Sequence, residues 1–234
     1  MDPHVFQIGH IPSALWGPPS EQVIVAVHGA QSSKTDVPIR LLAETVPRCQ
    51  VLSFDLPEHG DRVAEPALCK LPVCVRELSA VLDYAEARWR TIGLFAVSMG
   101  AYLSLLACRD RRIEHAWFLS PVADMVRLTR DMMSWSGISE ARLEAEGAVP
   151  TAMGQTLYWD DWCYLRRHPA DRWPFPTDIL RGAGDTLCAE ETVTDLAKRS
   201  HCRLRIVEGA GHWFHTPEEL RALSDWLHET AFLR

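Results

Sequence analysis

Short, uninterrupted runs of apolar residues, each followed by a helical pattern, recur through the first half of the chain. The apolar runs cover residues 23–27, 51–54, 92–97 and 116–119, and the helical patterns between them cover 37–46, 73–89 and 99–108. Strands of a parallel sheet are covered on both faces, so they are apolar throughout rather than alternating. Strand, helix, strand at this spacing indicates right-handed βαβ units. We therefore expect an α/β fold with a central, mostly parallel sheet and helices on both faces.

The segment from about residue 122 to residue 176 interrupts this alternation. It has no strand signal, its period is helical, and it is rich in aromatic residues. We expect a small helical cap insertion that folds over the end of the sheet. Beyond it, apolar strands at 179–180 and 204–207 flank a helical pattern at 189–198, so the α/β alternation resumes.

The last helix is predicted to run from Pro217 to about Phe232. Its start is well marked, because Thr216 and Glu219 fit a capping box and Pro217 occupies the first helical position. Its apolar residues repeat at helical spacing, at Leu220, Leu223, Trp226 and Leu227. Packing of this face on the sheet is a sufficient role for the helix.

Length and charge limit the domain count and the partners. The 234 residues, 47% of them hydrophobic, suit a single domain with a sizeable core. The formal net charge is −7 and no dense basic run occurs, so we expect no nucleic-acid partner. A small-molecule substrate is the expected partner, and the oligomeric state is left open.

Cysteine spacing and the N-terminus bear on the cellular compartment. The seven cysteines form no Cys-x-x-Cys pair, which disfavours a disulfide framework or a zinc ribbon. The first residues lack the basic head and apolar core of a signal peptide, and no apolar stretch approaches the roughly 18 residues of a membrane span. We therefore expect reduced thiols, no membrane partner and a cytoplasmic location.

The sharpest local signal is Ala96-Val97-Ser98-Met99-Gly100, between an apolar strand and a helical pattern. Small residues two places before and after a serine allow an abrupt strand-to-helix turn, with the serine exposed at its apex and at positive φ. Gly-x-Ser-x-Gly is the usual form, and Ala96 departs from it by one methyl group. We predict Ser98 to be a nucleophile; the plainer alternative is a serine that only caps the helix.

A serine hydroxyl needs a base, and His212 is the best-placed candidate. Glu208-Gly209-Ala210-Gly211-His212 follows the last apolar strand directly, which places His212 at the carboxyl edge of the sheet. His215 is the rival, but it adjoins the helix cap and is expected to pack or cap there. The two histidines lack the intervening Glu and continuous helix of a His-Glu-x-x-His site, so no metal is expected.

The imidazole needs a carboxylate to fix its tautomer. Asp185 lies in a glycine loop, Arg181-Gly182-Ala183-Gly184-Asp185, at the end of the preceding strand, and it is the favoured acid. Asp124, after the strand that ends near Ser120, competes for this role. For either aspartate the plainer explanation is a loop cap or an Asx turn.

Acyl transfer also needs hydrogen-bond donors for the developing oxyanion. The amide of Met99 immediately follows the predicted nucleophile at a helix N-terminus, which makes it one donor. The second is expected from His28-Gly29-Ala30-Gln31, which follows the first long strand. Gly29 lets this loop approach the serine, so the amide of Ala30 is the natural donor.

These pieces together resemble the α/β-hydrolase superfamily along essentially the whole chain. The order Ser98, Asp185, His212 matches that superfamily, and His28-Gly29-Ala30 and Ser98-Met99-Gly100 are similar to its carboxylesterase and monoglyceride-lipase branch. Asp55-Leu56-Pro57-Glu58-His59-Gly60 resembles a loop that shapes the site without doing chemistry, so Asp55 and His59 are interpreted as structural. The resemblance implies a Ser-His-Asp triad and a variable cap. The glycine-rich stretches lack both the P-loop lysine and the spaced glycines of a dinucleotide-binding fold, so we expect no cofactor.

The expected function is a serine hydrolase that cleaves a small or medium carboxylic ester through an acyl-enzyme. The candidate substrate-pocket residues are Gln31, Trp159, Trp162 and Trp213. Two alternatives remain: a C-C bond or small-peptide hydrolase on the same scaffold, and a non-catalytic ligand receptor, which Ala96 at the elbow favours.

Overall fold

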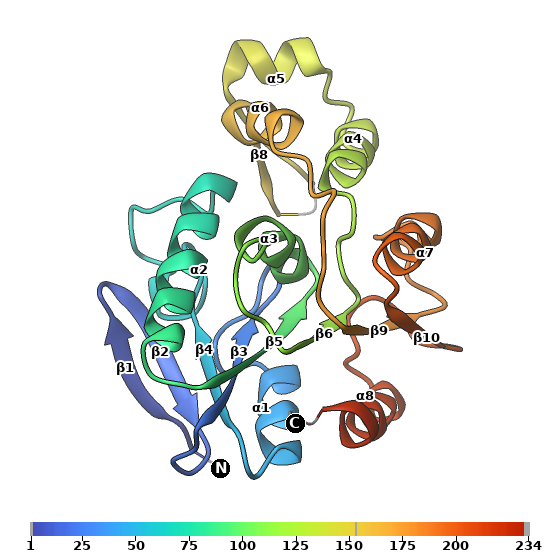
Figure 1. Cartoon of the computed structure of the whole chain (residues 1–234). Helices are drawn as coiled ribbons and strands as arrows, with labels where there is room; N and C mark the ends of the chain where they lie inside the picture. Colours follow the sequence, from blue (N-terminus) through green and yellow to red (C-terminus); the bar gives the residue numbers. More distant parts are fainter. Residues whose placement is uncertain (1, 153, 232–234) are drawn as a thin grey trace.

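A mixed, eight-stranded sheet runs through the molecule in the computed structural model, which describes residues 2–152 and 154–231 (Figure 1). Its strands lie in the order β1 (His4–Ile8), β2 (Ile11–Trp16), β4 (Gln50–Phe54), β3 (Gln22–Val27), β5 (Thr91–Val97), β6 (His115–Leu119), β9 (Thr177–Gly182) and β10 (Arg203–Val207). The strands from β4 to β10 in this order pair in parallel, whereas β2 is antiparallel to both β1 and β4. The predicted α/β fold with a mostly parallel sheet is confirmed.

Helices cover both faces of the sheet, as the sequence predicts. On one face lie α1 (Val37–Thr45) and α8 (Pro217–Thr230), which bury Ile39, Leu42, Leu223 and Trp226 in one apolar cluster. On the other face lie α2 (Leu71–Glu86), α3 (Met99–Ala107) and α7 (Glu190–Arg199), which share a second cluster. Because both faces are covered, the inner strands are apolar throughout: every residue of β4 is buried.

The N-terminal hairpin of β1 and β2 is an element that the sequence patterns did not single out. It is an edge of the sheet, and most of β1 is exposed. An exposed edge strand does not need a continuous apolar run, so it carries little sequence signal.

The start of α8 agrees with the prediction. The Thr216 side chain accepts a hydrogen bond from the Glu219 amide, and the Glu219 side chain accepts one from the Thr216 amide, which completes the capping box. The predicted end near Phe232 lies outside the described residues.

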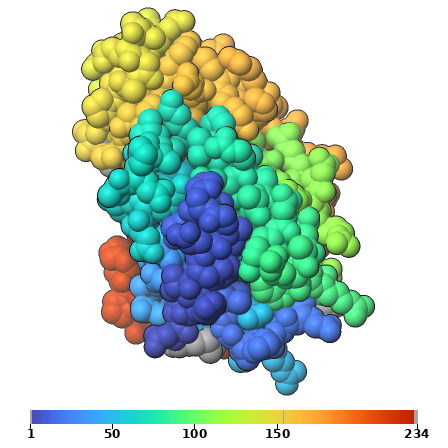
Figure 2. Space-filling view, turned by 90° about the vertical axis from the view of Figure 1, so that its left-hand side faces the viewer, coloured from blue at the N-terminus to red at the C-terminus, as the bar shows by residue number. Residues whose placement is uncertain are grey.

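The segment between β6 and β9 contains α4 (Met125–Trp135), α5 (Glu140–Glu146), β7 (Ala148–Pro150), β8 (Thr156–Tyr158) and α6 (Trp159–Arg167). Figure 1 shows it above α2 and α3, and Figure 2 shows the same segment, yellow to orange, on top of the molecule. The expectation of a segment without strands is wrong, because β7 and β8 pair as an antiparallel hairpin. Strands of three residues are too short to produce an alternating pattern.

Among the described parts of the chain, none of the helices has the length and the apolar character that crossing a membrane requires.

Candidate active site

Ser98 occupies the sharp turn between β5 and α3, with φ 51° and ψ −114°. This positive φ agrees with the predicted elbow. The turn is held from both sides: the Ser98 amide donates to the Leu119 carbonyl, and the Ser98 carbonyl accepts from the Val122 amide. Strain of about 1–3 kcal/mol is sustained at such a residue when its neighbours over-determine the conformation.

Gly100 and Ala96, the small residues on either side of the elbow, are under different steric constraints. A Cβ atom at Gly100 would lie 2.5 Å from the Val27 carbonyl oxygen, so only glycine allows α3 to begin this close to the end of β3. Ala96 is fully buried within β5, opposite Phe118 of β6, and its methyl group is part of the apolar core. The departure from the usual elbow motif therefore leaves the turn intact.

His212 and Asp185 complete a hydrogen-bonded chain that begins at Ser98. The Ser98 Oγ lies 2.9 Å from His212 Nε2, and His212 Nδ1 lies 2.8 Å from Asp185 Oδ2. All three residues are less than a tenth exposed. With its Nδ1–H donated to the carboxylate, the imidazole presents a lone pair at Nε2 toward the serine hydroxyl. The loops that end β5, β9 and β10 thus bring together the three predicted side chains.

The carboxylate of Asp185 is held in its ionised form. Burial by itself would raise its pKa, but the hydrogen bond from His212 and those from the Cys188 and Leu187 amides lower the pKa below its ordinary value. The competing acid, Asp124, instead caps α4 by accepting the Arg127 amide. The structure therefore places Asp185, not Asp124, against the imidazole.

Glu219 anchors the loop that carries His212, a role beyond the packing function expected of α8. Its carboxylate accepts the amides of Gly211, His215 and Thr216 at 2.8–2.9 Å. These backbone hydrogen bonds lower the pKa of Glu219 to about 2. His215, the rival histidine, takes part through its backbone and keeps its side chain exposed.

The predicted oxyanion donors lie beside the serine. A Cβ atom at Gly29 would lie 3.2 Å from the Ser98 Cβ, so glycine at this place allows the loop to pass the nucleophile closely. Ala30 and Met99 both line the cavity into which Ser98 opens. Within residues 2–152 and 154–231, neither amide donates a hydrogen bond to a protein acceptor. Both are available to a ligand oxygen.

A buried histidine supports the loop that contains Ala30. His28 Nε2 accepts the Leu56 amide, and its Nδ1–H therefore donates to the Gly29 carbonyl. Burial lowers the pKa of His28 to about 4, so the ring is neutral at physiological pH. The Asp55 carboxylate beneath this loop accepts from the Lys34 amide, the Lys34 ammonium and the Asp61 amide. These contacts agree with a structural role for Asp55.

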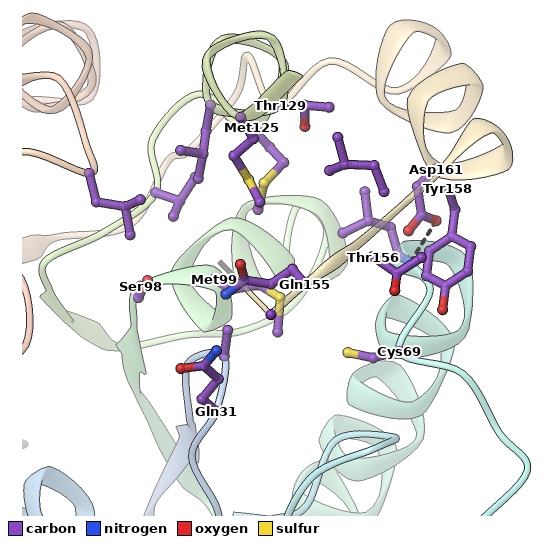
Figure 3. Close-up of a pocket in the computed structure, with 18 of the residues that line it drawn as sticks. Gln31, Cys69, Ser98, Met99, Met125, Thr129, Gln155, Thr156, Tyr158 and Asp161 are labelled. Carbon is purple, nitrogen blue, oxygen red and sulfur yellow. Dashed lines mark hydrogen bonds between the residues drawn. The ribbon is translucent and has the colours of Figure 1, made fainter. Parts of the chain in front are cut away.

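A cavity of about 390 Å³ extends from Ser98 beneath the segment between β6 and β9 (Figure 3). Of the predicted pocket residues, Gln31, Trp162 and Trp213 line it, but Trp159 does not. The prediction that Trp159 lines the pocket is wrong, and the period of the α-helix gives the reason. The cavity is lined by Tyr158, Asp161, Trp162 and Leu165, which share one face at the start of α6, and Trp159 lies outside that face.

Several residues that line the cavity were not identified from the sequence. One face of α4 lines the cavity with Met125, Leu128, Thr129 and Met132, at the spacing of successive helical turns. That spacing is a signal in the sequence, but it does not tell what the face packs against. Cys69, Tyr158 and Asp161 lie at the opposite end of the cavity (Figure 3). Glu58 and His59 line it beside Cys69, whose amide donates to the Glu58 carboxylate and whose thiol contacts the His59 ring. His59, interpreted as structural, is therefore also part of the cavity wall.

A smaller hollow of about 180 Å³ also borders Ser98. It is lined by His212, Trp213 and Phe214, together with the loop that contains Ala30 and the start of α1. The Trp213 ring meets the His212 ring edge-on, with the centroids 5.0 Å apart. Ser98 thus borders two spaces of different size.

Asp185, Cys188 and His212 also form a group whose metal-ligand atoms lie within 4.8 Å of one another. Burial raises the pKa of the Cys188 thiol to about 12, so the free thiol is protonated near neutral pH. Both Asp185 oxygens already accept hydrogen bonds, one of them from His212. This chemistry fits a histidine-carboxylate pair better than a metal site.

Comparison with known proteins agrees with the fold. The model of a family described as the Alpha/beta hydrolase family matches residues 24–225. Est1E from Butyrivibrio proteoclasticus, solved with ferulic acid bound, is similar with a TM-score of 0.77 and 20% identity, covering 97% of this chain and 99% of that chain. A putative hydrolase from Agrobacterium vitis S4 has a TM-score of 0.78 and 15% identity, covering 97% and 98%.

Alpha/beta hydrolase domain-containing protein 10 from mouse is also similar, with a TM-score of 0.75 and 14% identity, covering 99% of this chain and 98% of that chain. At such identities these solved structures bear on the fold alone. The search of curated proteins finds no match. Because the family model spans most of the chain, the protein belongs to the alpha/beta hydrolase family.

Proposed function

We propose that the protein is a serine hydrolase that cleaves small or medium carboxylic esters, with Ser98 as nucleophile, His212 as base and Asp185 as its orienting acid. The observation that carries the proposal is the pair of hydrogen bonds, 2.9 Å and 2.8 Å long, that links the three side chains. Such a chain converts a weakly nucleophilic hydroxyl into an attacking group.

In the proposed reaction, Ser98 Oγ attacks the ester carbonyl carbon while His212 Nε2 takes the hydroxyl proton. The amides of Ala30 and Met99 stabilise the oxyanion of the tetrahedral intermediate. His212 then gives the proton to the departing alcohol, which leaves an acyl group on Ser98. Water, deprotonated by the same imidazole, releases the carboxylic acid.

The two spaces beside Ser98 suit the two halves of an ester. The departing alcohol must receive its proton from His212, which lines the smaller hollow of about 180 Å³. The acyl group therefore belongs in the larger cavity of about 390 Å³, which Met99 also lines. These volumes favour a small alcohol and a small or medium acyl group.

We further propose that residues 122–176 act as a cap on a single hydrolase domain that spans the chain. The methionine and leucine side chains of α4 form part of the wall of the larger cavity, which supports a role in limiting acyl size. Est1E, similar in fold, has ferulic acid bound, and this supports a small-molecule substrate. The carboxylesterase and monoglyceride-lipase branch, a cytoplasmic location and the absence of a cofactor or nucleic-acid partner stay predictions.

The test is labelling by a fluorophosphonate probe together with turnover of p-nitrophenyl esters. We expect the wild type to be labelled and active, and Ser98→Ala to lose both while it unfolds at a similar urea concentration. Ser120→Ala is the matched control, because Ser120 is also buried and at positive φ, but its Oγ has no hydrogen-bond partner among the described residues.

Each alternative gives a different result. An unlabelled wild type would support a non-catalytic receptor. Labelling without ester turnover, but with turnover of a diketone or an aminoacyl substrate, would support a C-C bond or small-peptide hydrolase. Full activity in Ser98→Ala would contradict the assignment of the nucleophile.

A further inference from the structure

The larger cavity has polar groups at the end away from Ser98. Tyr158 and Asp161 stand at that end (Figure 3), whereas apolar side chains such as Met125, Met132 and Leu165 form other parts of the wall. An acyl chain that starts at Ser98 and fills the cavity therefore ends beside polar groups. A purely hydrocarbon chain would offer those groups no further hydrogen-bond partner.

Asp161 is a carboxylate with one oxygen already engaged. Its Oδ1 accepts the Leu71 amide at 2.9 Å, which ties the start of α6 to the start of α2. The other oxygen has no hydrogen-bond partner among the described residues, and Asp161 takes part in no ion pair there. The nearby Lys70 is bound elsewhere, because its ammonium pairs with Asp160 at 2.9 Å and lies over the Tyr158 ring.

Carboxylates supply the charge that the cavity wall carries at this end near neutral pH: Asp161 and Glu58 line it, and none of the described lining residues is Lys or Arg. His59 is the lining group that can take up a positive charge, since burial by itself would lower its pKa but hydrogen bonds to Cys69 and the Pro57 carbonyl raise it. Burial raises the pKa of Asp161 to about 6, and it outweighs the Leu71 amide and the Lys70 ammonium, which lower the pKa. An anionic group on a substrate would be repelled here, whereas a hydrogen-bond donor would meet an acceptor.

We propose that Asp161 is a specificity-determining residue, which accepts a hydrogen bond from a hydroxyl or ammonium group at the far end of the substrate's acyl chain. The substrate class is then an ω-hydroxy or ω-amino acyl ester of a small alcohol. This inference rests on the proposed ester hydrolysis and adds the chemistry of the distal group.

The test compares methyl esters of increasing acyl length that end in methyl, hydroxyl, ammonium or carboxylate. The assay runs at about pH 8, where a carboxyl group with a pKa of about 6 is ionised. At the best length, we expect kcat/KM for the hydroxyl or ammonium ester to exceed that for the methyl-terminated ester about 10- to 100-fold, as for a hydrogen bond to a charged acceptor. The carboxylate ester should be the poorest substrate.

Asp161→Asn tests the residue itself. The amide oxygen can still accept from the Leu71 amide, so the tie to α2 is kept, while an NH2 group replaces the free carboxylate oxygen. We expect the ratio of kcat/KM for the hydroxyl- or ammonium-terminated ester to kcat/KM for the methyl-terminated ester to fall about 10-fold or more. Asp160→Asn is the matched control, since Asp160 is exposed and paired with Lys70, and it should keep the preference.

Failure of this inference can be told from failure of the proposed function. If the wild type cleaves the methyl-terminated esters without any preference for a donor, or if Asp161→Asn keeps the preference, the inference is wrong and the esterase proposal stands. If no ester is cleaved, the esterase proposal fails. Affinities of the same esters for Ser98→Ala, measured by calorimetry, then decide: a donor preference supports the role of Asp161, and equal affinities contradict it.

Discussion

Ser98 illustrates how one residue can combine strain with reactivity. Its φ of 51° points the hydroxyl away from the strand axis and toward His212 Nε2, and hydrogen bonds to Leu119 and Val122 maintain that conformation. The imidazole is oriented in turn by Asp185. Because each side chain sets the direction of the next, a change that alters the tautomer acts on the nucleophile without touching it.

Asp185→Asn changes the tautomer while it preserves the shape of the site. The asparagine oxygen would remain with the Leu187 and Cys188 amides, so its NH2 group would face His212 Nδ1 and require that nitrogen to accept. Nε2 would then carry the proton and could not take one from Ser98. We expect kcat for a p-nitrophenyl ester to fall by up to about 10⁴-fold.

Asp124→Asn is the control for this experiment. Asp124 caps α4 through the Arg127 amide, and asparagine is also a good cap, so both activity and stability should stay close to wild type. Activity of Asp185→Asn within a few-fold of wild type, or an equal loss in Asp124→Asn, would contradict the assignment of the acid.

At the scale of elements, the start of α8 and the loop after β10 behave as one unit. Glu219 belongs to the helical capping box, and the same carboxylate holds the Gly211 and His215 amides on either side of His212. A local helix-start signal thereby also determines where the base lies. The helix is consequently a positioning element as well as a packing element.

Glu219→Ala should affect both stability and rate. Loss of the capping box is expected to lower the free energy of unfolding by about 1–2 kcal/mol. Release of the His212 loop should lower kcat about 10- to 100-fold with little change in KM, because misplacement of a reacting group affects the chemical step. Urea unfolding and steady-state kinetics measure the two effects.

Glu219→Gln and Glu218→Ala complete this experiment. Glutamine retains an oxygen acceptor for the loop and should restore part of kcat, whereas a purely structural role would change stability alone. Glu218 is exposed, and among the described residues its ion-pair partner is Arg221. Glu218→Ala should therefore change neither the free energy of unfolding nor kcat. A wild-type kcat in Glu219→Ala would show that the loop does not depend on this anchor.

At the scale of the whole molecule, polar groups buried under the site make stability depend on pH. An unfolded histidine binds a proton below about pH 6.5, whereas burial lowers the pKa of His28 to about 4. Between these values the unfolded chain binds more protons than the folded one, so the free energy of unfolding falls as the pH falls. Asp161 acts in the opposite direction below about pH 6, because its pKa is raised in the fold.

His28→Gln isolates this contribution. Glutamine can accept the Leu56 amide and donate to the Gly29 carbonyl, but it does not titrate. Between about pH 6.5 and pH 4, the wild type should lose up to about 3 kcal/mol of unfolding free energy relative to the variant, and the contribution of Asp161 cancels in the difference. Urea unfolding at several pH values gives both curves, and parallel curves would contradict the prediction.

The sequence by itself determined the parts that depend on nearby residues. The parallel strands follow from uninterrupted apolar runs, the elbow at Ser98 from the small residues on both sides of it, and the start of α8 from its capping box. Each of these features depends on contacts within a few residues, on a periodicity, or on burial of both faces of the sheet. Such contacts are visible in a linear pattern.

Only the tertiary structure decided which distant groups meet. The sequence favoured Asp185 but left Asp124 as a competitor, and the choice between them depended on which loop reaches His212. Trp159 and Asp161 are two residues apart, yet only Asp161 lines the cavity, against a backbone amide 90 residues earlier in the chain. Helix orientation and loop packing are set by the free energy of the whole fold, so no local pattern records which face of α6 the substrate would touch.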